Sequence, residues 1–447
     1  MAFNKRIIAG WTCIFLGIVP NPWLLGLLVA ADGQIDDPIG LILIVSWDLL
    51  LVASGVLLML NIKQILKRAA VNGVMVLVSL ILGLVLAEVG LRMSVQWGLS
   101  DEIYFNRYYC QGPERRGKFH KTFGWTEYPN AQYFERKTKH DSWSLFTFNG
   151  EGFRDRYNSG SDRILVLGDS YMRGTLVGDR ANMPFLLDRW SPGTTFLNYG
   201  TAGYSTSNEW QLYRTKADEA DHKLVILGYF FNDAPGNLSP NPLNPRFRLT
   251  DGGLKLVREP LPINWVRRFR DSLERNLAVY VFLKRRLTAM TETSENTPST
   301  GKRLRNELNL TRALLSAIGN RALNEGSDYL IVAIPTREEV TGNWGRRFSR
   351  ERGSRYYDQQ RSVLKTVAEQ SPRFHVLDLK TYLRNEENPS SLYGKVDRHL
   401  NEKGQWLSAR IIHQWLGDNG YVSNEFDNYK KFLRDGSSVN SYPECPK

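Results

Sequence analysis

A short apolar run that ends in Gly-Asp-Ser is found at Arg163-Ile164-Leu165-Val166-Leu167-Gly168-Asp169-Ser170-Tyr171. A nearly continuous apolar run of this length is typical of a strand buried on both faces of a parallel sheet. Gly168 permits a sharp turn after the strand, and Ser170 would then begin a helix with its hydroxyl at the end of the sheet. By itself the motif is equally compatible with an ordinary helix N-cap, so the rest of the chain has to decide.

Four more apolar runs of the same kind follow, at residues 195–198, 224–227, 329–334 and 374–379. Helical patterns fall between or after them, including 304–324, 355–370 and 404–416. Strands that alternate with helices predict an α/β fold, a parallel sheet covered by helices on both faces.

The α/β pattern also divides the chain. We expect an α/β domain over residues 162–420, preceded by an aromatic-rich lead-in over 98–161 and followed by a polar tail over 421–447. Residues 237–268 and 291–301 are rich in polar and turn-forming residues, and we interpret them as insertions, the second as a mobile loop.

The first 97 residues predict a membrane anchor. Three apolar runs, at about 7–29, 38–60 and 70–95, each reach the roughly 20 residues that a membrane-spanning helix needs. A cleaved signal peptide has one short apolar core, so three runs favour stable anchoring. Pro20-Asn21-Pro22 interrupts the first run, which can be a kinked helix or a re-entrant hairpin.

The loops predict the orientation of these spans. Basic residues precede the first run and occupy the second loop, whereas the first loop carries three aspartates. Basic loops stay in the cytoplasm, so three crossings would place the C-terminal domain outside it.

Two ionisable residues, Asp48 and Glu88, lie within the apolar runs and are functional candidates for that reason. We favour a structural interpretation. In it, Asp48 lies near a helix end or bonds a neighbouring helix, and Glu88 pairs with Arg92 one turn later.

Composition excludes several classes of function. The net charge is +12, but the basic residues are scattered and form no nucleic-acid-binding signature, so no nucleic-acid partner is expected. The three cysteines form no CxxC pair, and the histidines other than His399 have no metal-ligand spacing, so we expect no metal or cofactor. Cys13 lies in an apolar run, and Cys110 and Cys445 either pair in an exported domain or stay free.

Chemistry-bearing residues follow the predicted strands. Ligands bind at the carboxyl ends of strands in open parallel sheets. Residues 198–203, Asn-Tyr-Gly-Thr-Ala-Gly, follow the second strand, and Phe231-Asn232-Asp233 follows the third. Backbone N–H groups beside glycine and an asparagine amide are donors that suit an oxyanion hole. Further on, Asp397-Arg398-His399 would supply a general base and the group that orients it.

Together and in this order, these motifs resemble the SGNH (GDSL-type) hydrolase superfamily, over about residues 163–416. The resemblance implies a three-layer, flavodoxin-like α/β domain with Ser170 as the nucleophile. It also implies that Gly203 and Asn232 join the Ser170 N–H as oxyanion donors, and that Asp397 and His399 complete a triad. The anchor and lead-in are similar to membrane-bound members in bacterial envelopes, which implies an inner-membrane protein with a periplasmic domain.

The sequence departs from the family pattern in two places. Phe230 stands where the third motif normally has glycine, and the last motif reads Asp-x-His instead of Asp-x-x-His. The shorter spacing changes how the carboxylate reaches the imidazole Nδ1. Four neighbours of the motifs are candidate pocket residues, of which we expect the two aspartates to bond loop backbone and the two tyrosines to line the pocket or to pack: Asp169, Tyr171, Tyr204 and Asp233.

The resemblance implies a serine esterase or O-acyltransferase that acts on ester-linked acyl groups of an envelope glycan or lipid. The altered motifs motivate an alternative, a catalytically idle domain that binds glycan or scaffolds an envelope polysaccharide complex. A third hypothesis, suggested by the extra spans and Asp48, is an acyl carrier to a membrane-embedded acyltransferase partner. One triad serves hydrolysis and transfer alike, so the sequence leaves both open.

Overall fold

The structure is a computed structural model that describes residues 5–18, 21, 38–59, 65–96, 108–110, 117–136, 143–154, 160–219, 221–262, 264–291, 301–344, 350–394 and 397–423. The chain forms two compact units. We call Met1–Phe105 with Ile263–Ser294 the anchor unit, and Asn106–Pro262 with Glu295–Lys447 the sheet unit. The predicted domain over 162–420 is thus interrupted, because its residues 263–294 group with the N-terminal helices.

The sheet unit is built on five parallel strands in the order β12-β11-β8-β6-β7. Their bounds are β6 Asp162–Gly168, β7 Thr194–Asn198, β8 Leu224–Phe230, β11 Asp328–Ile334 and β12 Phe374–Asp378. All five predicted strands are confirmed, β8 being three residues longer than expected. After β7 the chain crosses to the other side of β6, so the carboxyl ends of β6 and β8 flank the point where the strand order reverses.

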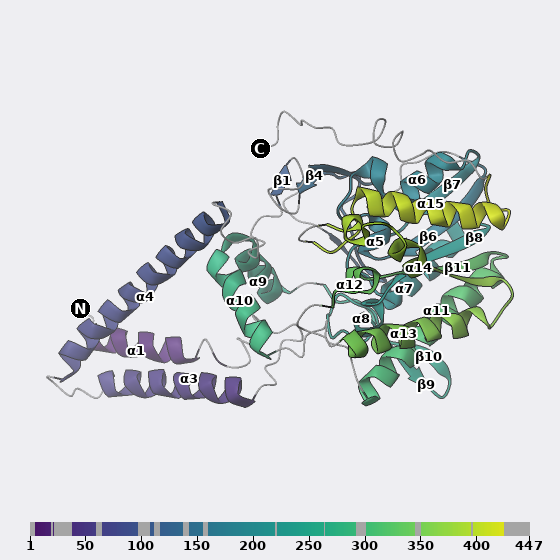
Figure 1. Cartoon of the computed structure of the whole chain (residues 1–447). Helices are drawn as coiled ribbons and strands as arrows, with labels where there is room; N and C mark the ends of the chain where they lie inside the picture. Colours follow the sequence, from purple (N-terminus) through teal and green to yellow (C-terminus); the bar gives the residue numbers. More distant parts are fainter. Residues whose placement is uncertain are drawn as a thin grey trace. The chain divides into compact units, whose positions relative to one another are not determined.

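Helices cover both faces of this sheet, which makes three layers (Figure 1). Side chains alternate along each strand, so Ile164 and Val166 join one core cluster while Leu165 and Leu167 join the other. The first cluster packs under α6 Met183–Trp190, α14 Leu379–Arg384 and α15 Glu402–Asp418. The second packs under α7 Thr206–Lys216, α11 Gly301–Asn324 and α13 Arg350–Ala368.

Smaller elements surround this sandwich. The lead-in forms an antiparallel sheet of β1 Tyr108–Cys110, β4 Gln132–Arg136 and β5 Ser144–Thr147, and a hairpin of β2 Lys118–His120 and β3 Gly124–Thr126. The first predicted insertion contains the hairpin β9 Arg246–Thr250 and β10 Gly253–Arg258. Short helices are α5 Ser170–Arg173, η1 Asp179–Ala181, η2 Ala217–Glu219, α8 Asp233–Gly236, α12 Arg337–Thr341 and η3 Pro389–Leu392.

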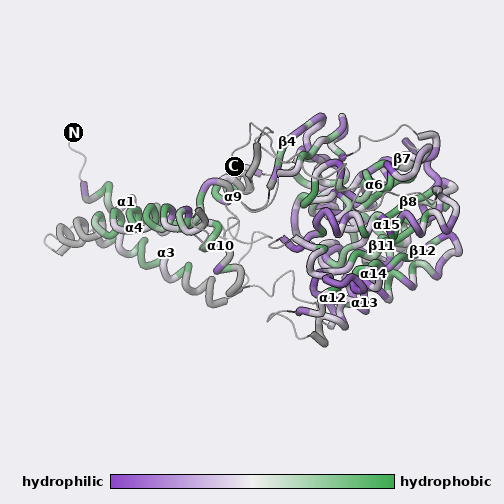
Figure 2. Tube along the Cα trace, turned by 45° about the horizontal axis from the view of Figure 1, so that its top comes forward, coloured by the Kyte–Doolittle hydropathy of each residue, from purple (hydrophilic) through white to green (hydrophobic). Residues whose placement is uncertain are grey.

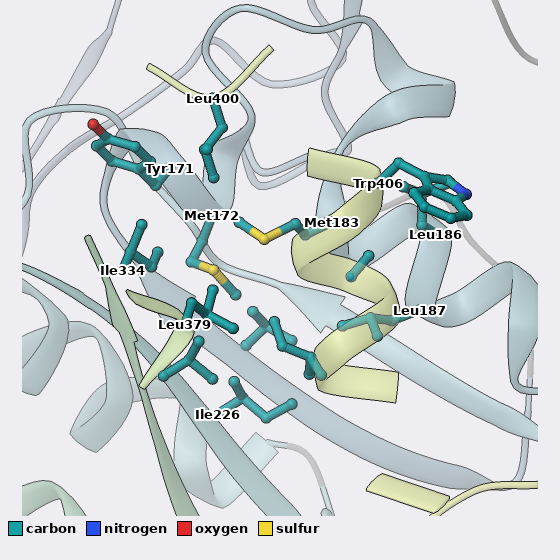
Figure 3. Packing of buried hydrophobic residues seen from close by; sticks show 14 of the residues in the cluster. Tyr171, Met172, Met183, Leu186, Leu187, Ile226, Ile334, Leu379, Leu400 and Trp406 are labelled. Atoms are coloured by element: carbon teal, nitrogen blue, oxygen red, sulfur yellow. The ribbon is translucent and has the colours of Figure 1, made fainter. Parts of the chain in front are cut away.

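The contact between β6 and β8 positions α5. Gly168 and Gly228 lie opposite each other in these two strands. A Cβ atom on Gly228 would lie 2.2 Å from Met172 Cγ, and one on Gly168 would lie 2.4 Å from it. The two glycines therefore leave the space that Met172 fills, in the same core as Met183 and Leu379 (Figure 3). Because Ser170 lies two residues before Met172, this packing sets where the serine lies above the sheet.

The anchor unit consists of α1 Lys5–Ile18, α3 Pro38–Met59, α4 Ile65–Gln96, α9 Trp265–Asn276 and α10 Ala278–Thr291. Within the described residues, Gly73–Ser94 of α4 is long and apolar enough to cross a membrane, with a mean hydropathy of 2.6. Figure 2 shows hydrophobic residues, in green, along the traces of α1, α3 and α4. The apolar stretches of α1 and α3 are shorter, Ile7–Ile18 and Ile44–Val56, so three crossings remain a prediction.

Other predictions for the anchor have mixed outcomes. The expected pair of Glu88 and Arg92 is confirmed at 2.7 Å. Asp48 lies in the middle of α3, not near its end, and its Oδ1 has no hydrogen-bond partner among the described residues. Cys13 is a free thiol. Cys445 and most of the predicted loop 291–301 lie outside the described residues, so the proposed pair with Cys110 stays untested.

The close contact at Gly228 predicts a specific defect. In Gly228→Ala the new methyl group displaces Met172, and overpacking of this kind costs about 1–3 kcal/mol of folding free energy. We expect a lower melting temperature of the sheet unit, partly restored in the double variant with Met172→Ala, because the two substitutions share one space. Gly252→Ala, in the β9–β10 turn, is the control, since only Thr250 Oγ1 at 3.9 Å would face its Cβ. Equal melting temperatures for Gly228→Ala and Gly252→Ala would contradict the packing argument.

Candidate active site

Ser170 is the first residue of α5, directly after β6. Asp169 caps this short helix, with its Oδ1 accepting a hydrogen bond from the Tyr171 N–H at 2.9 Å. Gly174 ends the helix in the left-handed conformation, at φ +73°. A four-residue helix between a strand and a glycine thus holds the Ser170 hydroxyl at the carboxyl end of the sheet.

Ser170, His399 and Asp397 form a continuous hydrogen-bonded chain. Ser170 Oγ lies 2.7 Å from His399 Nε2. On the other side of the ring, His399 Nδ1 hydrogen-bonds with Asp397 Oδ1. The same carboxylate oxygen accepts the backbone N–H of His399 at 3.1 Å. The Asp-x-His spacing therefore reaches Nδ1 through a local turn in which one oxygen binds both the backbone and the ring of His399.

The loop that carries His399 is held at both ends. The Gly394 N–H donates to the His399 carbonyl at 2.9 Å, and Leu400 is fully buried in the core. Asn401 then caps α15 by accepting the Gly404 N–H at 3.1 Å. The imidazole is thus placed by a backbone hydrogen bond, a buried leucine and a helix start.

Two further predicted residues, Gly203 and Asn232, follow β7 and β8. Gly203 adopts φ +82°, a conformation that favours glycine. Among the hydrogen bonds of the described residues, none uses the N–H of Gly203 or that of Ser170. Asn232 is exposed, and its side chain is among the groups that oppose the rise that burial causes in the pKa of Asp169, whose Oδ2 lies 3.4 Å from Ser170 Oγ. Two N–H groups and one amide are therefore the candidate donors near the serine.

Phe230, the residue that replaces glycine in the family pattern, forms part of a row of rings. Its ring lies 4.2 Å from that of Tyr171, which lies 4.8 Å from the imidazole of His399. The Tyr171 hydroxyl donates to the Arg398 carbonyl at 3.3 Å. Phe230 thus adds an aromatic ring that packs against Tyr171, the residue whose own ring contacts His399.

The four candidate pocket residues are all buried: Asp169, Tyr171, Tyr204 and Asp233. The two aspartates bond loop backbone, since Asp233 Oδ2 accepts the Phe230 N–H at 3.2 Å as Asp169 accepts that of Tyr171. Tyr204 donates its hydroxyl to the Trp125 carbonyl. Asp169, Asp233 and Tyr204 therefore hold the loops of the site, and Tyr171 also packs directly against His399.

The structure adds a contribution that the sequence analysis missed, from the lead-in hairpin β2–β3. Trp125 donates its indole N–H to the Ala202 carbonyl at 3.2 Å, next to Gly203. Its ring would lie 3.4 Å from a Cβ on Gly203. Asn208 of α7 in turn donates its Nδ2–H to the carbonyl of Phe123 in the hairpin, at 3.0 Å. The hairpin therefore fixes the loop that carries Gly203, and the only sequence signal was the Phe-Gly-Trp triplet at 123–125.

Two buried arginines brace the end of α5. Arg154 donates to the carbonyls of Arg173 and Gly174 at 2.7 and 3.0 Å, and pairs with Asp179 at 2.8 Å. Arg173 pairs with Glu127 of the lead-in at 2.7 Å. Because buried guanidinium groups need every such partner, these contacts tie the turn after the serine helix to the lead-in.

Three buried carboxyl groups near the serine, those of Asp169, Asp233 and Glu209, interact electrostatically with one another. Burial raises the pKa of Asp169 to about 6, although its hydrogen bond from the Tyr171 N–H opposes the shift. Burial and then the neighbouring carboxylates raise the pKa of Asp233 and of Glu209 well above their usual range. Neither oxygen of Glu209 has a hydrogen-bond partner among the described residues. The region under the site therefore disfavours negative charge.

The remaining described histidines have structural contacts. His120 stacks on Phe123, His222 lies 3.0 Å from the Tyr213 hydroxyl, and His413 lies 3.2 Å from the Trp190 carbonyl. In the described part of the chain, no three His, Cys, Asp or Glu side chains are grouped to hold a metal ion.

Comparisons with known proteins give distant likenesses of fold. No family model and no curated protein matches the chain. Among solved structures, TesA is similar at 13% identity and a TM-score of 0.35, over 57% of this chain and 99% of the other. A G-D-S-L family lipolytic protein from Desulfitobacterium hafniense (12%, 0.34, 57% and 99%) and the esterase EstA from Pseudoalteromonas (13%, 0.32, 57% and 100%) are also similar. Likenesses this distant do not decide an activity, which has to be inferred from the geometry of the site itself.

The contact of Trp125 with the Gly203 loop leads to a first prediction for the site. Trp125→Phe keeps a ring beside Gly203 but removes the donor to Ala202. We expect about a tenfold slower reaction of Ser170 with an acylating probe, because a displaced oxyanion donor stabilises the transition state less. Trp210→Phe is the control, since that indole packs against the core of the sheet unit. Equal reaction rates for the two variants would show that the hairpin has no effect on the donors.

The buried Glu209 predicts how stability depends on pH. Its pKa in the folded state lies above the ordinary 4.5, so the folded chain keeps a proton that the unfolded chain releases as the pH rises. The free energy of unfolding therefore falls as the pH rises above 4.5, the ordinary pKa of a glutamate, and Glu209→Gln avoids this loss. The melting temperature of Glu209→Gln minus that of the wild type should increase between pH 4.5 and pH 8. Exposed Glu387 gives the control variant Glu387→Gln, whose difference should stay flat. A flat difference for Glu209→Gln would contradict the prediction.

Proposed function

We propose that the chain is a membrane-anchored serine esterase or O-acyltransferase with Ser170 as the nucleophile. The observation that carries this proposal is the 2.7 Å contact of Ser170 Oγ with His399 Nε2, together with the hydrogen bond of His399 Nδ1 to Asp397. A hydroxyl, an imidazole and a carboxylate in this order are the parts of a nucleophilic triad. Ser170 begins α5 after β6, and Asp397 and His399 share the loop before α15, so the three residues meet at the carboxyl end of β6, where parallel sheets bind ligands.

The proposed reaction begins with proton transfer. Asp397 accepts the Nδ1–H of His399, which leaves the lone pair of Nε2 directed at the serine hydroxyl. His399 removes the proton as Ser170 Oγ attacks the carbonyl carbon of an ester, and the carbonyl oxygen gains the negative charge. His399 then protonates the leaving alkoxide, and Ser170 keeps the acyl group.

The N–H groups of Ser170 and Gly203 and the amide of Asn232 are the proposed donors to the oxyanion. Support comes from the unused N–H groups and the exposed amide described above. Such donors stabilise the transition state because they are fixed before the charge develops. Asn232 is among the groups that oppose the rise that burial causes in the pKa of Asp169, whose Oδ2 lies 3.4 Å from Ser170 Oγ, and this supports a shared placement of donor and nucleophile.

The second half of the reaction separates the two activities. Water releases the acyl group in an esterase, and a sugar hydroxyl accepts it in a transferase; His399 serves as the base in both cases. We propose an acylated glycan or lipid of the bacterial envelope as the substrate and a periplasmic location for the site. Support comes from the apolar helix α4 and from the charge pattern of the loops. A membrane-embedded acyltransferase partner would fit the transferase form.

The alternative of a catalytically idle domain was motivated by the Asp-x-His spacing and by Phe230. In the structure Asp397 contacts the ring of His399, and Phe230 packs behind Tyr171. No structural observation therefore favours the idle domain over the enzyme.

A fluorophosphonate probe on the detergent-extracted full chain tests the proposal. We expect labelling of the wild type, none of Ser170→Ala or His399→Ala, and labelling slowed about 10³–10⁴-fold in Asp397→Ala. Asn232→Ala should react about 10²–10³-fold more slowly, because it lacks one oxyanion donor.

The controls are Ser362→Ala, on the exposed side of α13, and His375→Ala, which packs on Trp415. Both should label like the wild type. A folded wild type that does not label, or a Ser170→Ala variant that does, would rule out the proposed nucleophile.

A further inference from the structure

The anchor unit contains a helical hairpin that lies, in sequence, between two segments of the sheet unit. Helices α9 and α10 come between β10 and α11, and a single residue, Leu277, joins them. They group with the N-terminal helices, and α10 contacts α4. The chain therefore leaves the sheet unit after Pro262 and returns to it at Glu295, in addition to its connection before residue 106.

One ion pair on α4 binds the backbone at the corner between these helices, where α9 ends and α10 begins. Glu88 accepts the backbone N–H groups of Ala278 and Val279 with its two oxygens, at 2.9 and 2.8 Å. Arg92 donates to the Asn276 carbonyl at the end of α9, and to Glu88 Oε1, each at 2.7 Å. The first N–H groups and last carbonyls of helices lack partners within the helix. A carboxylate at a helix start and a guanidinium at a helix end also match the helix dipoles.

The position of this ion pair along α4 indicates how deep in the membrane the corner between α9 and α10 would lie. Glu88 is six residues before Ser94, the end of the apolar span, which at the rise of an α-helix is ~9 Å. Amphipathic helices that lie in a membrane interface are buried by about 5–10 Å. An ion pair at this depth needs hydrogen-bond partners, and the hairpin supplies them.

The hairpin exposes large apolar side chains on both helices. Trp265 and Phe269, one turn apart on α9, are 73% and 52% exposed. Leu283 and Leu287, one turn apart on α10, are 48% and 46% exposed. Residues 265–291 also include seven basic and two acidic residues, a net charge of +5. Apolar faces on a strongly basic helical pair are typical of segments that lie on anionic membranes.

We propose that α9 and α10 lie in the lipid interface of the membrane that α4 crosses, with Trp265 and Phe269 among the acyl chains. Basic residues of the hairpin then face anionic phospholipid headgroups, and Glu88 and Arg92 hold its corner to α4. The lipid is the expected occupant because no residue of the apolar span of α4, which carries the ion pair, is fully buried within the protein. The inference rests on the membrane anchoring in the proposed function. It makes the hairpin a second attachment of the sheet unit to the membrane.

Quenching of tryptophan fluorescence by brominated phospholipids tests the lipid contact. The full chain is reconstituted in liposomes of brominated phosphatidylcholine, with or without brominated phosphatidylglycerol. We expect the quenched part of the emission to fall in Trp265→Phe, and more so with the anionic lipid at low salt. Trp190→Phe is the control: that indole is buried in the core of the sheet unit, so its removal should leave the quenched part unchanged.

The same samples distinguish the possible failures. If the chain resists alkaline extraction but Trp265 contributes nothing to quenching in either lipid, the hairpin faces water or a protein and the inference is wrong. If phosphatidylcholine and phosphatidylglycerol quench equally at low salt, the part of the inference that concerns anionic headgroups is wrong. If alkali extracts the chain, membrane anchoring itself fails, whatever the outcome of the fluorophosphonate test.

Hydrogen exchange in the same liposomes tests the role of the ion pair. In Glu88→Ala, peptides that contain the amides of Ala278 and Val279 should exchange about tenfold faster, because both N–H groups lose their acceptor. Glu274→Ala is the matched control, since it removes a glutamate that pairs with Lys284 within the hairpin and leaves the cap intact. Equal exchange in Glu88→Ala and the wild type would show that α4 does not hold the corner.

Discussion

The rest of the site depends on how closely β6 and β8 approach each other at Gly168 and Gly228. Neither glycine has room for a Cβ, because Met172 fills the space over both. A side chain from the serine helix is thereby sealed into the same core as the helices of one face of the sheet. The nucleophile is therefore placed by apolar packing, and its position is as rigid as the core itself.

A second level of support comes from outside the sheet. The lead-in contacts the loop of Gly203 through Trp125 and the turn after α5 through two buried arginines. Trp125 and Arg154 donate to backbone carbonyls and Arg173 pairs with the Glu127 carboxylate, so these contacts fix loop geometry without entering the chemistry. The buried carboxyl groups of Asp169, Asp233 and Glu209 lie under the same loops, where burial holds their pKa values high.

The anchor unit applies similar chemistry in an apolar setting. Glu88 and Arg92 are an ion pair within an apolar helix, an arrangement that is costly unless every donor and acceptor is used. The corner of a helical pair from far along the chain supplies partners, two N–H groups for Glu88 and a carbonyl for Arg92. The simple expectation of a pair within one helix was confirmed, yet that pair is one of the four hydrogen bonds described for these two side chains.

The parallel α/β fold, its five strands and the segments that carry Ser170, Asn232 and His399 could be predicted from the sequence, because apolar runs, turns and motif order are local patterns. The structure was needed to show that the Asp-x-His spacing closes a chain of hydrogen bonds, and that Trp125 supports the Gly203 loop. It alone assigned residues 263–294 to the anchor unit. These outcomes depend on contacts between residues far apart in the chain or on the geometry of a turn. Periodicity along the sequence carries no information about either.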